Sequence, residues 1–305
     1  VFWVTNEEDN LNYWEDFEEL EIDLFPAFLH FPYEKPLRSH QTEGQRLKTL
    51  TALILKENPI IITSLKSLIY PLLPKEIFSS EILILEIGKE IKRENLEEFL
   101  TKNYYKRVEH VEGLREYTVR GGIVDIYPVT SELPIRVEFF GDEISSMRFF
   151  NLEDRKSIRN VEKFILTPLH ELIEPSDEEK IFSKSLEKRR SFLSYLPKDT
   201  LIVFEDLNGA KILLEKWEEK GEKTLGIRKE KVKGKIYFLE DELLEELSHF
   251  QNIDLHSLEE PDITFSFYSP PQYRGTGEFL EKSLKEYTEN GWEIYISSEH
   301  QEILR

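Results

Sequence analysis

Apolar residues recur at two spacings along the chain. Over residues 1–81, short apolar runs such as "VFWVT" and "IIIT" alternate with segments whose apolar residues lie three or four positions apart, the spacing of an amphipathic helix. Residues 6–20 are one such predicted helix, and another begins at a capping box of Thr42 and Gln45. Strands that alternate with helices are typical of an α/β domain. The unbroken run "IIIT" predicts a strand buried on both faces of a parallel sheet.

The spacing changes over residues 82–168, where short strands with period-two alternation follow one helix. Gly121-Gly122 and Gly141-Asp142 supply turn residues between these strands. We therefore expect a separate α+β unit with antiparallel pairing. Its predicted segments are the helix "RENLEEFLTKNYY" and the strands "REYTVR", "IVDIYP", "PIRVEFF", "ISSMRFF" and "EKFILTP".

The α/β spacing returns over residues 169–270, with strands "TLIVF" and "KIYFL", a helix ending at Gly221 and a helix in "EDELLEELSHF". The simplest arrangement is one parallel-sheet domain in two segments, 1–81 and 169–270, interrupted by the α+β insert. Residues 271–305 then form a linker and the start of a further α/β domain. Because the chain opens inside a strand-like run and closes inside a helix-like one, we expect it to be a fragment.

Composition restricts the partners and the chemistry. The 60 acidic and 40 basic side chains give a formal charge of −20, so a module that binds only nucleic acid would need a local basic patch against the overall field. Cysteine is absent, which excludes disulfides, thiolate zinc sites and a cysteine nucleophile. No apolar run reaches the roughly 18 residues of a membrane span. We expect a cytoplasmic location.

Motifs for catalysis are missing. Neither G-x-x-x-x-G-K-[ST] nor G-x-G-x-x-G occurs, and no G-x-S-x-G or H-E-x-x-H is found. Glu205-Asp206 ends the strand "TLIVF" and leaves two interpretations open, a Mg²⁺ ligand pair or a solvated strand end. His40 fits the start of a helix better than a catalytic role. We expect no cofactor, no metal and no enzymatic activity in this chain.

The stretch "IRVEFFGDEI" contains one large apolar residue too many. With period-two alternation, Ile135, Val137 and Phe139 point to one face of the strand, whereas Arg136 and its neighbours Glu138 and Phe140 point to the other. Arginine and an aromatic ring on one charged face are typical of a protein-binding hot spot. The alternative is a second small core, with Phe140 under the helix at residues 93–105.

The segment "EYTVRGGIVDIYPVTSELPIRVEFFGDEISSMRFFNLEDRKSIRNVEKFILTP" resembles the inserted domain shared by the bacterial transcription-repair coupling factors (Mfd) and the excision-repair subunit UvrB. The shared features are R-G-G-I before an apolar-Asp-apolar-apolar-Pro run, S-E-x-P-x-R-x-E-F-F-x-D-E-I, S-I-R and a closing L-x-P. A weaker resemblance extends over most of residues 1–270, and the tail is similar to the start of the next coupling-factor domain.

The resemblance implies a recruiting role. In this family the insert binds UvrA, the damage-sensing ATPase, and the matching positions are Arg120, Arg136 and Phe140, with the arginine fork gripping a partner carboxylate. The altered Glu205-Asp206 and the missing P-loop favour the coupling factor, whose module of this kind is helicase-like with degenerate nucleotide motifs. The alternative is a fragment of a UvrB-type ATP-dependent helicase whose P-loop precedes Val1. Full-length coupling factors also bind RNA polymerase and translocate on DNA with ATP, through domains absent here.

Overall fold

The computed structural model describes residues 1–8, 11, 21–32, 34, 39–55, 60–168, 189–225, 237–255 and 277–291. The chain divides into two compact units, residues 1–258 and 259–305. The second unit contains helix α9 (Gly277–Glu289). Most of the helix predicted over residues 6–20 lies outside the described residues.

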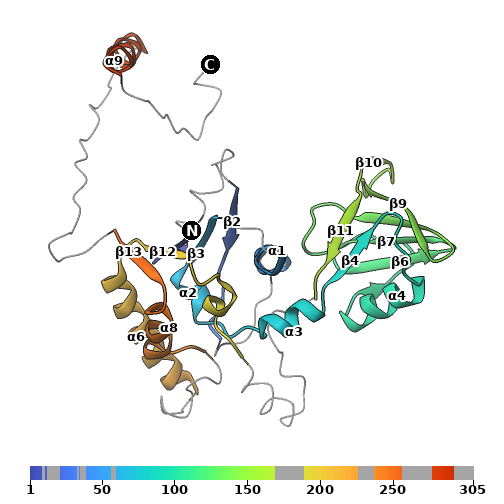
Figure 1. Cartoon of the computed structure of the whole chain (residues 1–305), viewed down its shortest axis with the longest axis horizontal. Coiled ribbons are helices and arrows are strands. Elements are labelled where there is room, and N and C mark those ends of the chain that lie inside the picture. The colour runs from blue at the N-terminus through green and yellow to red at the C-terminus, as the bar shows by residue number, and fades with distance from the viewer. Residues whose placement is uncertain are drawn as a thin grey trace. The chain divides into compact units, whose positions relative to one another are not determined.

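The first sheet has five parallel strands in the order β13-β12-β1-β3-β2. Strand β1 pairs with β3 on one side and with β12, about 200 residues later in the sequence, on the other. Figure 1 shows these early and late strands side by side, in blue and in yellow to orange. The strands are β1 (Phe2–Thr5), β2 (Ile22–Phe25), β3 (Ile60–Ser64), β12 (Leu201–Phe204) and β13 (Gln251–Asp254).

Both faces of this sheet are buried at its central strands. Alternate strand residues such as Phe2, Ile61 and Ile202 pack with apolar helix residues in one large cluster. Ile62 points the other way and packs with Leu24 in a second, smaller cluster, so the prediction for "IIIT" is confirmed. The helices of this region are α1 (His40–Leu55), α2 (Leu65–Leu68), α3 (Lys75–Ser80), the 3₁₀ helix η2 (Phe192–Tyr195), α6 (Leu207–Leu225) and α8 (Glu240–Leu247).

The second sheet has six strands in the order β10-β9-β8-β7-β6-β5, and only the β5–β6 pair is parallel. Strands β4 and β11 form a separate antiparallel ribbon. The five strands predicted from alternation are all present. The bounds are β4 (Leu83–Glu86), β5 (Lys106–Arg107), β6 (Glu116–Arg120), β7 (Ile123–Ile126), β8 (Ile135–Phe140), β9 (Glu143–Phe150), β10 (Ser157–Asn160) and β11 (Lys163–Leu166).

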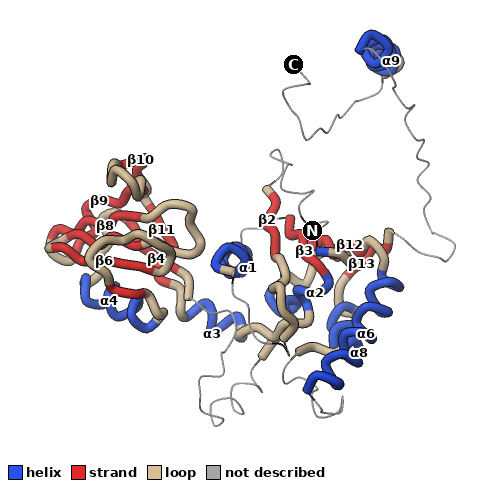
Figure 2. Tube along the Cα trace, turned by 180° about the vertical axis from the view of Figure 1, so that it is seen from behind, coloured by secondary structure: helices blue, strands red, loops and turns tan. Residues whose placement is uncertain are grey.

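Helix α4 (Arg93–Lys102) covers one face of the six-stranded sheet. Leu96 and Leu100 of this helix pack in one core with Val124, Val137 and Met147, and the ribbon of β4 and β11 adds further apolar residues. Figure 2 shows α4 against the strands from behind. The core of this region therefore lies on the α4 side of the sheet.

Three predicted details differ from the structure. Helix α1 begins at His40, so Thr42 is inside it, and the Ser39 hydroxyl instead accepts a hydrogen bond from the Thr42 N–H, with 3.4 Å between Oγ and N. Helix α6 continues past Gly221 to Leu225. In the predicted strand "KIYFL", the described residues 237–239 are buried but form no strand.

Candidate partner-binding surface

Phe140 is the last residue of β8, and 83% of its surface is exposed. It lies opposite Glu143 of β9, at the tip of the β8–β9 hairpin. Val137, on the other face of the same strand, is fully buried with the α4 residues. The alternative placement of Phe140 under the helix is therefore wrong, because α4 packs against the opposite face.

The hairpin tip is held from the side by the segment before α4. The Ile91 N–H donates to the Asp142 carbonyl oxygen with 2.8 Å between N and O, and the Ile144 N–H donates to the Lys89 carbonyl oxygen at 3.0 Å. The β8–β9 register also shifts between Glu138 and Phe139, which is a β-bulge. These contacts fix the position of the strand end that carries Phe140.

The turn between β6 and β7 lies next to this tip. Gly121 has a φ of +58°, the left-handed conformation that favours glycine. Its carbonyl oxygen accepts a hydrogen bond from Arg93 Nη1, with 2.7 Å between the atoms, and Arg93 is the first residue of α4. The carbonyl oxygen of Gly122 accepts from the Phe139 N–H at 2.7 Å. Helix, turn and hairpin are thus tied together beside Phe140.

Arg136 is bound within the sheet. Its Nε and Nη2 donate to Oδ1 and Oδ2 of Asp125, at 2.6 and 2.8 Å, in a two-pronged ion pair with the facing residue of β7. Its guanidinium carbon also lies 4.9 Å from the ring centre of Phe150. The hydrogen bonds and charge of Asp125 raise the pKa of Arg136. The fork that was expected to grip a partner carboxylate is therefore used by the buried Asp125.

A second ion pair lies on the same face. The Glu138 carboxylate accepts hydrogen bonds from Arg148 and from the Ser146 hydroxyl. Both residues belong to β9, and Arg148 lies directly opposite Arg136 in the ladder. The hydrogen bonds from Arg148 and Ser146 lower the pKa of Glu138 to about 2. The two ion pairs leave this part of the face close to neutral.

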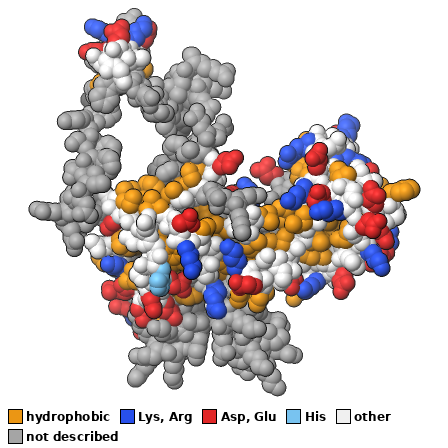
Figure 3. Space-filling view, in the orientation of Figure 1, with side chains coloured by type: hydrophobic (Ala, Val, Ile, Leu, Met, Phe, Trp, Pro, Cys, Tyr) orange, Lys and Arg blue, Asp and Glu red, His pale blue; other side chains and the backbone are white. Residues whose placement is uncertain are grey.

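Arg120 ends β6 and is exposed. Its Nη2 donates to the Glu109 carbonyl oxygen at 2.5 Å and lies 2.6 Å from His110 Nδ1. Both contacts hold the guanidinium without neutralising it, since neither acceptor is a carboxylate. Figure 3 shows side chains of both charges interspersed over the six-stranded region. The structure thus places Arg120 and Phe140 at the surface, whereas Arg136 is bound within the sheet by Asp125.

The other candidate residues have structural roles. Asp206 Oδ1 accepts a hydrogen bond from the Gly209 N–H at 2.8 Å, which caps the N-terminus of α6. Glu205 accepts a hydrogen bond from Trp3 Nε1 at 3.2 Å. His40 is the exposed first residue of α1. Within the described part of the chain, no group of three His, Cys, Asp or Glu side chains is arranged to hold a metal ion.

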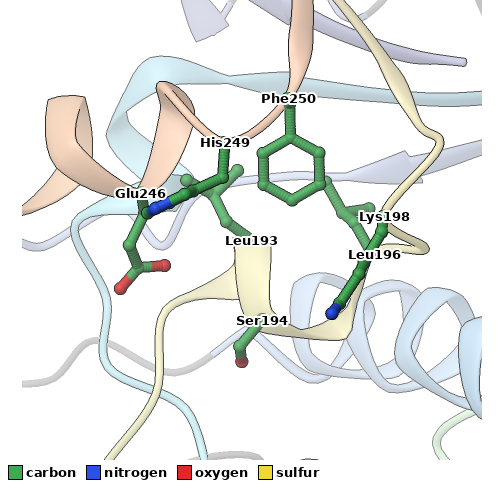
Figure 4. Close-up of a pocket in the computed structure, with 7 residues that line it drawn as sticks. All are labelled: Leu193, Ser194, Leu196, Lys198, Glu246, His249 and Phe250. Atoms are coloured by element: carbon green, nitrogen blue, oxygen red, sulfur yellow. The ribbon is translucent and has the colours of Figure 1, made fainter.

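A pocket of about 440 Å³ lies between η2 and the end of α8. Figure 4 shows Leu193, Leu196 and the Phe250 ring around it, with Lys198 and His249 at its sides. The carboxylate of its Glu246 accepts a hydrogen bond from the Ser191 hydroxyl, and burial raises the pKa of Glu246. The lining contains no metal-binding cluster, and nothing on its walls selects one ligand class. Among the described helices none is long and apolar enough to span a membrane.

Comparison with known proteins shows what the six-stranded region is similar to. Residues 83–172 match the family model of the UvrB interaction domain. The transcription-repair-coupling factor of Bacillus subtilis (strain 168) is 32% identical over 177 residues, which are 58% of this chain and 15% of that protein. The factor of Mycobacterium tuberculosis (strain CDC 1551 / Oshkosh) is 32% identical over 180 residues, 57% of this chain and 14% of that protein. That of Escherichia coli (strain K12) is 31% identical over 147 residues, 48% of this chain and 13% of that protein.

These matches confirm the resemblance inferred from the sequence motifs. The chain spans about 15% of the length of the curated relatives it matches. The family match includes β4 through β11, and hence the ribbon, helix α4 and the surface that carries Arg120, Arg136 and Phe140. Residues 83–172 therefore match the family model of the UvrB interaction domain, in a chain that is similar to part of the transcription-repair-coupling factors.

Proposed function

We propose that this chain recruits UvrA in the cytoplasm during transcription-coupled repair, through the surface formed by Arg120, Arg136 and Phe140. One observation carries the proposal, namely the phenyl ring of Phe140 with 83% of its surface exposed on a rigid hairpin tip. The match of residues 83–172 to the UvrB interaction domain family supports it. Sequence kinship supplies the identity of the partner, and the exposed ring supplies the physical reason to bind it.

The energetic argument rests on desolvation. An exposed Phe side chain leaves about 1.5–3 kcal/mol of burial free energy unrealised until another surface covers it. Hot spots combine such aromatic anchors with arginine at the centre of an interface. Because the tip is braced by hydrogen bonds to Asp142 and Ile144, little conformational entropy is lost when a partner binds. Phe140 is therefore the anchor of the proposed interface.

The test is direct binding of purified UvrA to the chain, measured by calorimetry and by co-elution. We expect Phe140→Ala to lose about 2 kcal/mol of binding free energy, about thirtyfold in Kd, because the truncation removes the anchor. Leu29→Ala is the matched control, since Leu29 is 77% exposed but lies outside the six-stranded region. Equal UvrA affinity for wild type and Phe140→Ala, with Leu29→Ala unchanged, contradicts the proposal.

We also propose that this chain is not itself catalytic. The carboxylates Glu205 and Asp206, where a helicase-like domain would hold a magnesium nucleotide, contact Trp3 and the start of α6. Contacts with RNA polymerase and DNA, and the ATP-driven translocation that the resemblance implies for full-length factors, are assigned to other domains. A titration of the chain with Mg-ATP should show no saturable binding, and saturable binding would favour a UvrB-type helicase fragment.

A further inference from the structure

We infer that the partner recognises one apolar side chain and one cation on this surface, Phe140 and Arg120, and that Arg136 is a positioning residue. This inference rests on the proposed UvrA-binding function and specifies its chemistry. The partner surface that fits is an apolar pocket with a single carboxylate beside it.

The first step is the charge of the face. Arg136 is paired with Asp125 and Arg148 with Glu138, and each pair is neutral as a whole. The depressed pKa of Glu138 keeps its carboxylate ionised, so the second pair persists at neutral pH. Arg120 contacts a carbonyl oxygen and an imidazole nitrogen, which leaves its positive charge uncompensated. Of these three arginines, Arg120 is therefore the one whose charge is available to a partner.

The second step is the geometry of Arg136. Its Nε and Nη2 are aligned with the two oxygens of Asp125, and its guanidinium lies over Phe150. The Arg136 side chain is 21% exposed and that of Asp125 is 7% exposed. A partner carboxylate could take this fork only by displacing Asp125, which would leave a buried carboxylate without its counter-ion. The ion pair instead joins β7 to β8 and fixes the strand that ends in Phe140.

The third step is the spacing that the partner must match. Arg120 lies opposite Ile123, and Ile123 lies opposite Glu138, two residues before Phe140 on the same face. Strands lie about 4.8 Å apart and rise about 3.4 Å per residue, so the backbones of Arg120 and Phe140 are on the order of 12 Å apart. The long Arg120 side chain spans part of this distance. The carboxylate of the partner should therefore flank the apolar pocket without lying inside it.

The experiment uses UvrA binding and thermal unfolding, both measured on the full chain. Asp125→Asn weakens the ion pair with Arg136 by changing a side chain that is too buried to touch a partner. We expect this variant to lower UvrA affinity about threefold or more. Arg136→Met alone should lower both stability and affinity, because Asp125 loses its counter-ion. The double variant Asp125→Leu/Arg136→Met replaces the pair by apolar side chains and should recover affinity to within about threefold of wild type.

Three outcomes overturn the inference. One is a folded double variant that binds as weakly as Phe140→Ala, because the guanidinium itself would then contact UvrA. Another, which applies even if the double variant does not fold, is Asp125→Asn with wild-type affinity and a lowered Tm. Arg120→Ala should bind about tenfold more weakly and lose most of the salt dependence of binding, and an unchanged affinity also overturns it. Failure of the proposed function is distinct, since wild type would then not bind UvrA or Phe140→Ala would bind equally well.

Discussion

Gly122 and Phe139 meet across the ladder between β7 and β8. The Phe139 N–H donates to the Gly122 carbonyl oxygen at 2.7 Å, and a Cβ added to Gly122 would lie 2.8 Å from the Phe139 carbonyl oxygen. Backbone atoms fill this space, so a methyl group there must displace β8 itself. Glycine is needed at position 122 because the two backbones approach closely there. The contact is made by Phe139, the residue before the proposed anchor Phe140.

Gly122→Ala should therefore destabilise the chain by about 1–3 kcal/mol and also weaken UvrA binding, because it moves the strand that ends in Phe140. The matched control is Gly121→Ala, where no heavy atom lies within 4 Å of the added Cβ and only the φ of +58° resists the change. We expect this control to cost about 1 kcal/mol. Urea denaturation measures both, and a Gly122→Ala variant as stable as wild type would contradict the steric argument.

Tyr104 should be replaceable by glycine with a gain in stability. It has a φ of +57° just after α4, and the Tyr105 N–H that follows donates to the Leu100 carbonyl oxygen at 2.9 Å, as at a helix end of the type that favours glycine. Its side chain is 71% exposed, so its removal uncovers little buried surface. We expect Tyr104→Gly to stabilise the chain by about 0.5–1 kcal/mol, read from the urea midpoint.

The control for this prediction is Glu98→Gly, at an exposed position inside α4. There glycine should destabilise by about 0.5–1 kcal/mol, because the helical conformation gives it no advantage. The same sign for both substitutions would mean that the backbone conformation of Tyr104 carries no cost.

Glu138 should make stability depend on pH in the acid range. Its pKa is about 2 in the folded chain and near 4.5 when unfolded, so the unfolded state binds the proton more readily. The stabilisation is fully present above about pH 5 and is lost as the pH falls towards 2. Because the pair with Arg148 is partly exposed, we expect about 1 kcal/mol or less.

Glu138→Gln should remove this component, so the difference in unfolding free energy between wild type and variant should shrink as the pH is lowered from 6 to 2. Glu112→Gln is a suitable control. The backbone N–H of Glu112 donates a hydrogen bond to Glu116, and the substitution leaves this bond in place. A difference that is constant over this range would show that the pair with Arg148 does not form in solution.

Asp206 should act as a helix cap. Asp206→Ala removes the acceptor for the Gly209 N–H and should destabilise the chain by about 1 kcal/mol. Asp206→Asn keeps an oxygen at the same position and should be near wild type. If Mg²⁺ raised the Tm of the wild type and not that of Asp206→Asn, Asp206 would be a metal ligand and not a helix cap.

Alternation along β8 was sufficient to predict that Arg136 and Phe140 share a face. It could not decide whether that face is covered, because this depends on the face of the sheet against which α4 packs. In the structure Leu96 and Leu100 of α4 pack on the face that carries Val137. Nor could it find the contact of Arg136 with Asp125, since these two residues become neighbours only through the register of β7 and β8. A strand pattern predicts directions of side chains, whereas ion pairs across strands need the pairing itself.

Three of the strands missed from the sequence share one property. Strands β5, β10 and β13 are two to four residues long and mostly polar, so they show no apolar alternation. Each lies at an edge of its sheet, where one side has no strand to pair with and apolar side chains are less needed. The division into residues 1–81, 82–168, 169–270 and 271–305 remains a prediction.

The pairing of β1 with β12 has a consequence for the order of assembly. The six-stranded sheet joins segments between residues 106 and 160, whereas β1 must wait for a neighbour that a ribosome makes about 200 residues later. Because distant contacts close slowly, we expect the six-stranded region to mature first and the parallel sheet to limit the overall refolding rate. During synthesis the edge of β1 stays open, and a chaperone that shields this edge would protect the nascent chain from wrong pairing.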